Sequence, residues 1–247
     1  MILDILNKCN IEGNSVRLPA VQLERNEYTE LEKMLLKAGA KKMRGKDFRF
    51  DFPTDAQPII DKLLGGDKID IKKEFQFFAT PKELAEKMLK LADLKSTDFI
   101  CEPSAGQGAI VDLIPKEFDN VFLYELNDLN RSVLESKGYI LTGDDFLKAK
   151  YDNTNIPVTN QFDKIIANPP FSKNQDCTHV QQMYNCLNEG GRIVTIMSNH
   201  WRESKNKKEM EFKAWLDNLD YSIDEIPRDT FKESGTSVSA CLVIIDK

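Results

Sequence analysis

The chain has 247 residues, 41% of them hydrophobic and 30% charged, which is the composition of a soluble globular protein. Its net charge of −6 excludes a surface that is basic throughout and leaves room for a local basic patch. A signal-peptide core and a stretch of transmembrane length are both missing, and the five cysteines and two histidines lack zinc-site spacing, so we expect free thiols, no metal and a cytoplasmic location.

The first 74 residues predict a small α+β domain. Helical patterns cover residues 28–37 and 56–64, each closed by glycine, and a short strand is expected over residues 46–52. Alternation in that strand places its three phenylalanines on one face. We expect an accessory or nucleic-acid-binding role for this domain.

From residue 75 onward, apolar runs alternate with helical patterns, which predicts a doubly wound, mostly parallel α/β sheet with helices on both faces. Seven strands are expected, over residues 97–102, 120–126, 139–142, 162–167, 192–197, 221–226 and 240–245. Helices are expected over residues 81–91, 107–114, 129–137, 178–187 and 207–219. No helix separates the last two strands, so we expect them to pair like a hairpin, which leaves one antiparallel strand in the sheet.

A glycine-containing loop follows the first strand of this second domain. Glu102, Pro103 and Ser104 lead through Gly106 and Gly108 into a helical pattern, as in the nucleotide-binding crevice of doubly wound folds. The third glycine of a dinucleotide fingerprint is missing, and Glu102 would repel a pyrophosphate. The same acid would attract a cation, and S-adenosylmethionine carries a sulfonium and an ammonium. An ordinary tight turn is the alternative interpretation.

Acidic residues also follow the next two strands. Glu125, with Leu126 beside it, stands where an acid can accept hydrogen bonds from both ribose hydroxyls of a cofactor. Asp145 can accept from an adenine amino group while Phe146 packs against the ring. Acids at strand ends are commonly just solvated, so the order of these residues along the chain is what favours a cofactor site.

The most informative stretch is Asn168-Pro169-Pro170-Phe171, which directly follows the buried strand over residues 162–167. Neither proline can donate a backbone hydrogen bond, so the loop presents an amide side chain, carbonyl oxygens and one aromatic face. This set suits an exocyclic amino group on a flat ring, because two acceptors can hold its hydrogens while the aromatic side chain stacks. A plain Pro-Pro turn explains the stretch equally well when it is considered alone.

Together these residues resemble the S-adenosylmethionine-dependent N6-adenine methyltransferases, most of which modify DNA. Motif X is similar to the segment with Phe78, Thr80 and Pro81, motif I to Glu102–Gly108, motif II to Glu125, motif III to Asp145-Phe146, and the catalytic motif IV to Asn168–Phe171. Two weaker similarities are Gly191–Met197 to motif VI, and Phe231–Ile245 with Gly235-Thr236 to motif VIII. The order X, I, IV is that of the gamma class, as in type I modification subunits. The resemblance implies a Rossmann-like methyltransferase sheet with S-adenosylmethionine as cofactor.

The implied reaction is direct methyl transfer to the N6 amine of adenine. Asn168 would accept one amine hydrogen through its side-chain oxygen and Pro169 the other through its carbonyl, which aims the nitrogen at the sulfonium methyl. Phe171 would stack on the base, which must leave a duplex to reach the loop. Gamma-class enzymes carry a target-recognition domain or use a separate specificity subunit. We recognise no such domain in this sequence, so we expect relaxed specificity or a separate subunit as partner.

Two basic clusters are candidates for phosphate contacts in DNA or RNA, with a solvated face as the alternative for each. The first lies in the small domain and comprises Lys41, Lys42 and Arg44, with Lys46 and Arg49 nearby. The second follows the strand over residues 192–197 and comprises Arg202, Lys205, Lys207 and Lys208.

Three other functions compete with DNA adenine methylation. RNA adenine methylation uses the same chemistry and stays open. Protein glutamine methyltransferases have a similar loop, usually with Tyr where this chain has Phe171, and the segment resembling motif X also argues against them. A non-catalytic binding module would be expected to have lost Asn168 or the glycines, and this chain keeps both.

Overall fold

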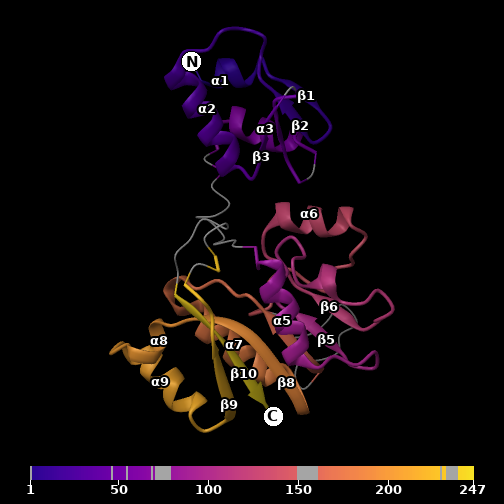
Figure 1. Ribbon diagram of the computed structural model, residues 1–247, viewed down its shortest axis with the longest axis vertical. Helices are drawn as coiled ribbons and strands as arrows, with labels where there is room; N and C mark the ends of the chain where they lie inside the picture. The colour runs from indigo at the N-terminus through magenta and orange to yellow at the C-terminus, as the bar shows by residue number, and fades with distance from the viewer. Residues whose placement is uncertain are drawn as a thin grey trace. The chain divides into compact units, whose positions relative to one another are not determined.

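The computed structural model describes residues 2–45, 47–53, 55–67, 69, 79–148, 161–228, 230–231 and 239–247. The chain divides into two compact units, Met1–Phe77 and Phe78–Lys247, which are described separately (Figure 1). Phe78, Gly235 and Thr236, which the sequence assigned to motifs X and VIII, lie outside the described residues. Within the described ranges, no helix combines the length and the apolar character needed to cross a membrane.

The first unit packs three helices against a small antiparallel sheet. The helices are α1 (Ile2–Leu6), α2 (Arg25–Lys37) and α3 (Gln57–Leu64), and the sheet has the order β1 (Asn10–Glu12), β2 (Ser15–Arg17), β4 (Arg49–Asp51), β3 (Lys41–Met43). Leu31 and Leu35, one turn apart on α2, are fully buried, as is Phe50 on β4. The expected helices and the strand around Phe50 are confirmed. The sequence patterns missed α1, β1, β2 and β3, which span only five and three residues and lack the three aligned phenylalanines that marked the segment around β4.

The second unit is built on a six-stranded sheet with the order β6-β5-β7-β8-β10-β9. The strands are β5 (Ile100–Glu102), β6 (Val121–Leu123), β7 (Phe162–Ala167), β8 (Leu187–Ser198), β9 (Asp220–Glu225) and β10 (Ala240–Asp246). The first four are parallel, and β10 runs antiparallel to both β8 and β9. A mostly parallel sheet with one antiparallel strand is therefore confirmed.

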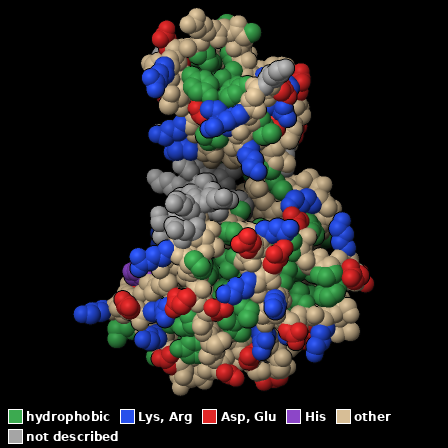
Figure 2. Space-filling model, viewed as in Figure 1, with side chains coloured by type: hydrophobic (Ala, Val, Ile, Leu, Met, Phe, Trp, Pro, Cys, Tyr) green, Lys and Arg blue, Asp and Glu red, His purple; other side chains and the backbone are tan. Residues whose placement is uncertain are grey.

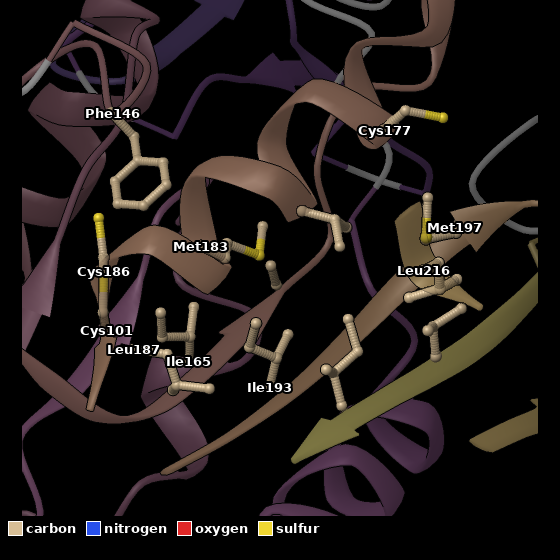
Figure 3. Packing of buried hydrophobic residues seen from close by; sticks show 14 of the residues in the cluster. Cys101, Phe146, Ile165, Cys177, Met183, Cys186, Leu187, Ile193, Met197 and Leu216 are labelled. Carbon is tan, nitrogen blue, oxygen red and sulfur yellow. The ribbon is translucent and has the colours of Figure 1, made fainter. Parts of the chain in front are cut away.

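Helices cover both faces of this sheet, because successive apolar residues along its strands point to opposite faces and both faces must be buried. Ile165 and Ile193 belong to the cluster under α7 (Gln175–Cys186) and α9 (Lys207–Leu216), which Figure 3 shows from close by. The next residue on each strand, Ile166 and Val194, points into a second cluster with α5 (Lys82–Ala92). The remaining helices are α6 (Asp128–Ser136), the short α8 (His200–Glu203), and two 3₁₀ turns, Val111–Leu113 and Ser172–Asn174. The layering is that of a doubly wound fold.

Two expected elements of this unit are wrong. No strand forms over residues 139–142, and a single parallel bridge joins Tyr124 to Gly143 instead. Tyr139 and Leu141 pack against the core cluster with α5 while Ile140 is 88% exposed, so the run contributes to the core without forming a strand. The helix expected over residues 107–114 is reduced to the Val111–Leu113 turn, because Gly108 has a φ of 92°, outside the helical region.

Candidate functional site

The carboxyl ends of the parallel strands define one edge of the sheet. The chain passes from β5 outward to β6 and then returns to the other side of β5 as β7, so the direction of winding reverses between β5 and β7. Crevices at such switch points are the usual ligand sites of doubly wound folds. Glu102 ends β5 and Asn168 directly follows β7, so the two side chains flank this point.

The loop after β5 folds tightly against the end of β6. Ala105 donates its N–H to the Tyr124 carbonyl at 2.9 Å, and Gly106 donates to Glu125 Oε2 at 2.7 Å. A Cβ added to Gly108 would lie 3.1 Å from Asp112 Oδ1 and 3.2 Å from a methyl of Leu134, in addition to its strained φ. Gly108 therefore has little room for a side chain, and Gly106 has a φ of 56°, in the left-handed region that glycine adopts most readily.

Glu125 is the centre of a hydrogen-bond network at the end of β6. Its side chain is buried, and Oε1 accepts from the Asn127 N–H at 2.8 Å and from Asn130 Nδ2 at 3.3 Å. Burial raises the pKa of Glu125 although these donors oppose the shift. The carboxylate thus orients the glycine loop through Gly106, a structural task beyond the ribose contact predicted from the sequence. Leu126, next to it, is 55% exposed.

Glu102 has a different environment. It is 2% exposed, and its Oε2 has no hydrogen-bond partner among the residues that the structure describes. Burial raises the pKa of Glu102 well above its ordinary value, while a backbone hydrogen bond from Val111 opposes the shift. An unsatisfied buried carboxylate oxygen costs free energy, and a cationic or hydrogen-bond-donating ligand would remove that cost. Pro103, which follows it, is buried, and Ser104 is half-buried.

The expected motif X and motif IV segments meet in the structure. Asn168 Nδ2 donates to Thr80 Oγ1 at 3.1 Å, a bond between residues 88 positions apart in the chain. Thr80 is buried, and Pro81 stands at the N-cap of α5, so the partner of Asn168 is itself well anchored. The sequence assigned each segment to its motif by resemblance alone, and the hydrogen bond places Thr80 beside the predicted catalytic amide.

The rest of the loop after β7 is partly packed against the protein. Pro169 is buried and Pro170 is half-buried. Phe171 is also half-buried and packs against the core cluster under α5. Its aromatic ring therefore already has protein contacts, and stacking on a base stays a prediction.

Asp145 and Phe146 contact protein groups in this structure. Asp145 Oδ1 accepts the Leu147 N–H at 3.1 Å, and Oδ2 pairs with Lys148 at 2.9 Å. Phe146 is 2% exposed and lies in the core shown in Figure 3, edge-on to Tyr124 at 5.3 Å. The adenine contacts expected of both residues stay predictions.

The second basic cluster is only partly available for phosphate contacts. Arg202 is held by Glu225 at 2.7 Å, and Lys207 lies 3.7 Å from Glu211 in an exposed pair. Lys205 and Lys208 are exposed. Lysine and arginine side chains are interspersed with acidic ones on the face of this unit shown in Figure 2, so the positive charge is local.

The first basic cluster, Lys41, Lys42 and Arg44, belongs to the first unit, Met1–Phe77. Lys42 pairs with Glu32 at 2.6 Å, and its ammonium lies 5.3 Å from the ring centroid of Tyr28 and 5.6 Å from that of Phe48. Its charge is thus largely satisfied inside the unit. Lys41 and Arg44 are exposed, and Lys46 lies outside the described residues.

The sequence analysis did not identify two buried carboxylates near the predicted catalytic loop. Asp176, in the first turn of α7, is 1% exposed and accepts from the Ser198 N–H at 3.0 Å and hydroxyl at 2.8 Å. Glu209, in the first turn of α9, is also 1% exposed. Glu209 shares the buried face of α9 with Phe212 and Leu216, at helical spacings of three and seven residues. The sequence signal that could have identified Glu209 is its position among the apolar residues of one helix face.

Solved methyltransferases share the architecture of this chain. The methyltransferase subunit of a type I restriction-modification system from Streptococcus thermophilus matches with a TM-score of 0.60 at 19% identity, covering 76% of this chain and 48% of that one. The M protein of the type I restriction enzyme EcoKI matches with a TM-score of 0.54 at 14% identity, covering 99% of this chain and 56% of that one. The fold is that of the Rossmann-like methyltransferases.

Similarity in sequence is more limited. The ribosomal RNA small subunit methyltransferase A of Mycoplasma mobile is 30% identical over 100 residues, which is 39% of this chain and 37% of that protein. No family model matches the chain. The chain spans about half the length of the two solved structures and a smaller share of the ribosomal RNA enzyme.

Proposed function

We propose that the second unit is an S-adenosylmethionine-dependent methyltransferase that acts on the N6 amine of adenine in DNA. The observation that carries this proposal is the Asn168 amide at the carboxyl end of β7, bonded to Thr80 at 3.1 Å and flanking the switch point of a methyltransferase fold. An amide fixed at this switch point suits recognition of an exocyclic amine by hydrogen bonds. The reaction then needs orientation and electrostatic stabilisation rather than a nucleophile from the protein.

The residues at this edge of the sheet fit S-adenosylmethionine, which would supply an electrophilic methyl group on a sulfonium. Glu102 offers a buried carboxylate oxygen without a partner in the described chain, which suits the cofactor's ammonium. Gly106 and Gly108 have φ values of 56° and 92° in the loop beside the switch point, and Glu125, which accepts the Gly106 N–H, is the proposed acceptor for ribose hydroxyls. Leu126, half exposed beside Glu125, offers an apolar surface to a ring.

The proposed chemistry is carried by the loop after β7. The side-chain oxygen of Asn168 and the carbonyl of Pro169 accept the two hydrogens of the target amine and turn its lone pair toward the methyl group. Phe171 stacks on the adenine ring and fixes its plane. Each contact is strongest when the nitrogen becomes tetrahedral, so the loop stabilises the transition state more than the ground state.

Incubation of the purified chain with methyl-labelled S-adenosylmethionine and separate pools of DNA, RNA and protein tests the proposal. We expect label in DNA, recovered after digestion as N6-methyl-deoxyadenosine. Label recovered only in protein, or at another position of the base, would contradict the proposed chemistry. Wild-type chain with a specificity subunit added should be assayed in parallel, because the matching structures include subunits of multi-component enzymes.

RNA is the second candidate substrate. The specific observation in its favour is the 30% identity over 100 residues to a ribosomal RNA methyltransferase. If RNA is the substrate, label appears as N6-methylated adenosine in the RNA pool and not in DNA. The 2′-hydroxyl is the group that distinguishes the two, so matched oligonucleotides of one sequence, as DNA and as RNA, give the sharpest assay.

A further inference from the structure

Where the sequence predicts a helix after the glycine loop, Glu102–Gly108, the structure has only a 3₁₀ turn. A helix would hold the loop through a ladder of backbone hydrogen bonds. Here Gly108 donates its N–H to the Ala105 carbonyl at 2.8 Å and accepts the Asp112 N–H at 2.9 Å. These two short-range bonds leave the Gln107 carbonyl, in the middle of the loop, to be held by another part of the chain.

Side chains from the end of α6 supply that support. Lys137 Nζ donates to the Gln107 carbonyl at 2.6 Å and to Asp112 Oδ2 at 2.5 Å. The Tyr139 hydroxyl donates to the other carboxylate oxygen, Asp112 Oδ1, at 3.0 Å. Lys137, Asp112 and Tyr139 thus form a loop clamp, which joins the glycine loop to a helix about 30 residues further along the chain.

The helix end that carries the clamp is itself fixed. Gly138 has a φ of 87° and donates its N–H to the Glu135 carbonyl at 2.9 Å, while the Tyr139 N–H bonds the Leu134 carbonyl at 3.0 Å. This pair of bonds is the Schellman pattern that ends many helices at glycine. Leu134 is fully buried, which anchors the turn in the core. Lys137 and Tyr139, on either side of the glycine, therefore extend toward Asp112 from a defined backbone.

The clamp holds a part of the loop that Glu125 does not reach. Glu125 accepts the N–H of Gly106 at 2.7 Å, and Asn130 of α6 accepts from the Gln107 side chain at 3.2 Å. Lys137 instead holds the Gln107 carbonyl, which belongs to the peptide group between Gln107 and Gly108. Because Gly108 has a φ of 92°, the orientation of that peptide group decides how the loop ends.

We infer that Lys137 is a positioning residue for S-adenosylmethionine, which acts through the Gln107 carbonyl and Asp112 to hold the glycine loop in the conformation that receives the cofactor. This inference rests on the proposed function, in which that loop binds the cofactor. A loop that is already ordered binds without the cost of ordering it. A loop that is ordered only part of the time binds more weakly in proportion to that fraction. Loss of the clamp should therefore weaken cofactor binding and leave the chemistry at Asn168 unchanged.

The primary test is Lys137→Met, with Lys87→Met as matched control. Lys87 of α5 pairs with Asp224 at 2.8 Å, and its side chain is 43% exposed, against 37% for Lys137. We expect Lys137→Met to raise the Kd for S-adenosylmethionine at least about fivefold in calorimetry, and Lys87→Met to leave it within about twofold of wild type. At saturating cofactor, kcat of Lys137→Met should stay within about twofold of wild type, since the clamp holds no reacting group. A merely structural role would lower the Tm of Lys137→Met without changing the Kd of the folded variant. That result, an equal rise of Kd in the control, or a large loss of kcat at saturating cofactor would overturn the inference.

A second variant approaches the clamp from the loop. Asp112→Ala keeps the backbone N–H that bonds Gly108 but removes the carboxylate that Lys137 and Tyr139 share. If the clamp acts as a unit, Asp112→Ala also raises the Kd, and the double variant Asp112→Ala/Lys137→Met raises it no more than the worse single variant. A wild-type Kd in Asp112→Ala, or independent losses that multiply in the double variant, would show that Lys137 does not act through Asp112.

Amide hydrogen exchange of the chain without cofactor separates this inference from the proposed function. Peptides covering residues 105–112 should exchange faster in Lys137→Met than in wild type or Lys87→Met. Unchanged exchange would overturn the inference. If the wild-type chain binds the cofactor but methylates neither DNA nor RNA, the proposed reaction fails, while the Kd and the exchange rates still decide whether Lys137 positions the loop.

Discussion

Replacing Asn168 by alanine should separate catalysis from folding. Asn168 donates a partly buried hydrogen bond to Thr80 Oγ1 at 3.1 Å. Loss of such a bond costs about 1 kcal/mol of stability, which corresponds to a fall in Tm of roughly 2–4 °C for a unit of this size. Loss of a hydrogen-bonding group that acts in the transition state costs about 10²–10³ in kcat, or roughly 3–4 kcal/mol. The catalytic loss should therefore exceed the stability loss severalfold.

The assay measures methyl incorporation under single-turnover conditions together with a thermal melt and a cofactor titration for each variant. Asn218→Ala is the matched control, because Asn218 is exposed and donates to the Ala214 carbonyl at 2.6 Å, far from the loop in sequence. We expect near-normal turnover in Asn218→Ala and a loss of at least about a hundredfold in Asn168→Ala. Turnover of Asn168→Ala near the wild-type rate, with the variant folded and the cofactor bound, would refute the amine-holding mechanism.

Three further predictions follow from the same contacts. Glu125→Ala should weaken S-adenosylmethionine binding by at least about 1 kcal/mol, and calorimetry showing unchanged affinity would place the ribose contact elsewhere. Exposed lysines should bind phosphates, so their joint replacement should lower nucleic-acid affinity and flatten its salt dependence without changing cofactor affinity; fluorescence anisotropy at several salt concentrations measures both effects. The lysines to replace together by alanine are Lys205, Lys207 and Lys208. A hydrogen bond with Glu209 and the charge of Glu209 raise the pKa of His200. The pair therefore stabilises the folded state fully below the unfolded pKa of His200, about 6.5, and this stabilisation is lost as the pH rises through the folded pKa. Thermal melts should then show the gap between wild type and His200→Ala closing as the pH rises above about 6.5, and a gap independent of pH would contradict this pairing.

The parts of the fold that were predicted correctly share one physical property: their pattern depends on a large buried surface. The strand Phe162–Ala167 was predicted to the residue, because Ile165, Ile166 and Ala167 are buried in succession and two prolines just beyond Asn168 cannot continue the ladder. The parallel sheet, its single antiparallel strand and the two covered faces follow from several such runs. In contrast, the strand expected over residues 139–142 failed, because an apolar run at the sheet edge can pack against the core without forming a strand.

The candidate site was predicted less completely, because polar side chains take partners from distant parts of the chain. No local pattern shows that Asn168 meets Thr80, or that Lys42 is held by Glu32 and two rings. A resemblance to known motifs placed Thr80 near the site, but the buried acid Glu209 belongs to no such motif. The only local clue was its place on the apolar face of α9.

Two carboxylates at neighbouring strand ends illustrate how environment assigns roles to chemically similar residues. Burial raises the pKa of both Glu102 and Glu125, so a shifted pKa alone does not show which acid already has hydrogen-bond partners in the protein. Their contacts do show it. Glu125 accepts from Gly106, Asn127 and Asn130, so its charge orients the glycine loop before any ligand binds. Glu102 keeps one buried oxygen without a partner in the described chain, so a ligand that brings a positive charge gains most from binding there.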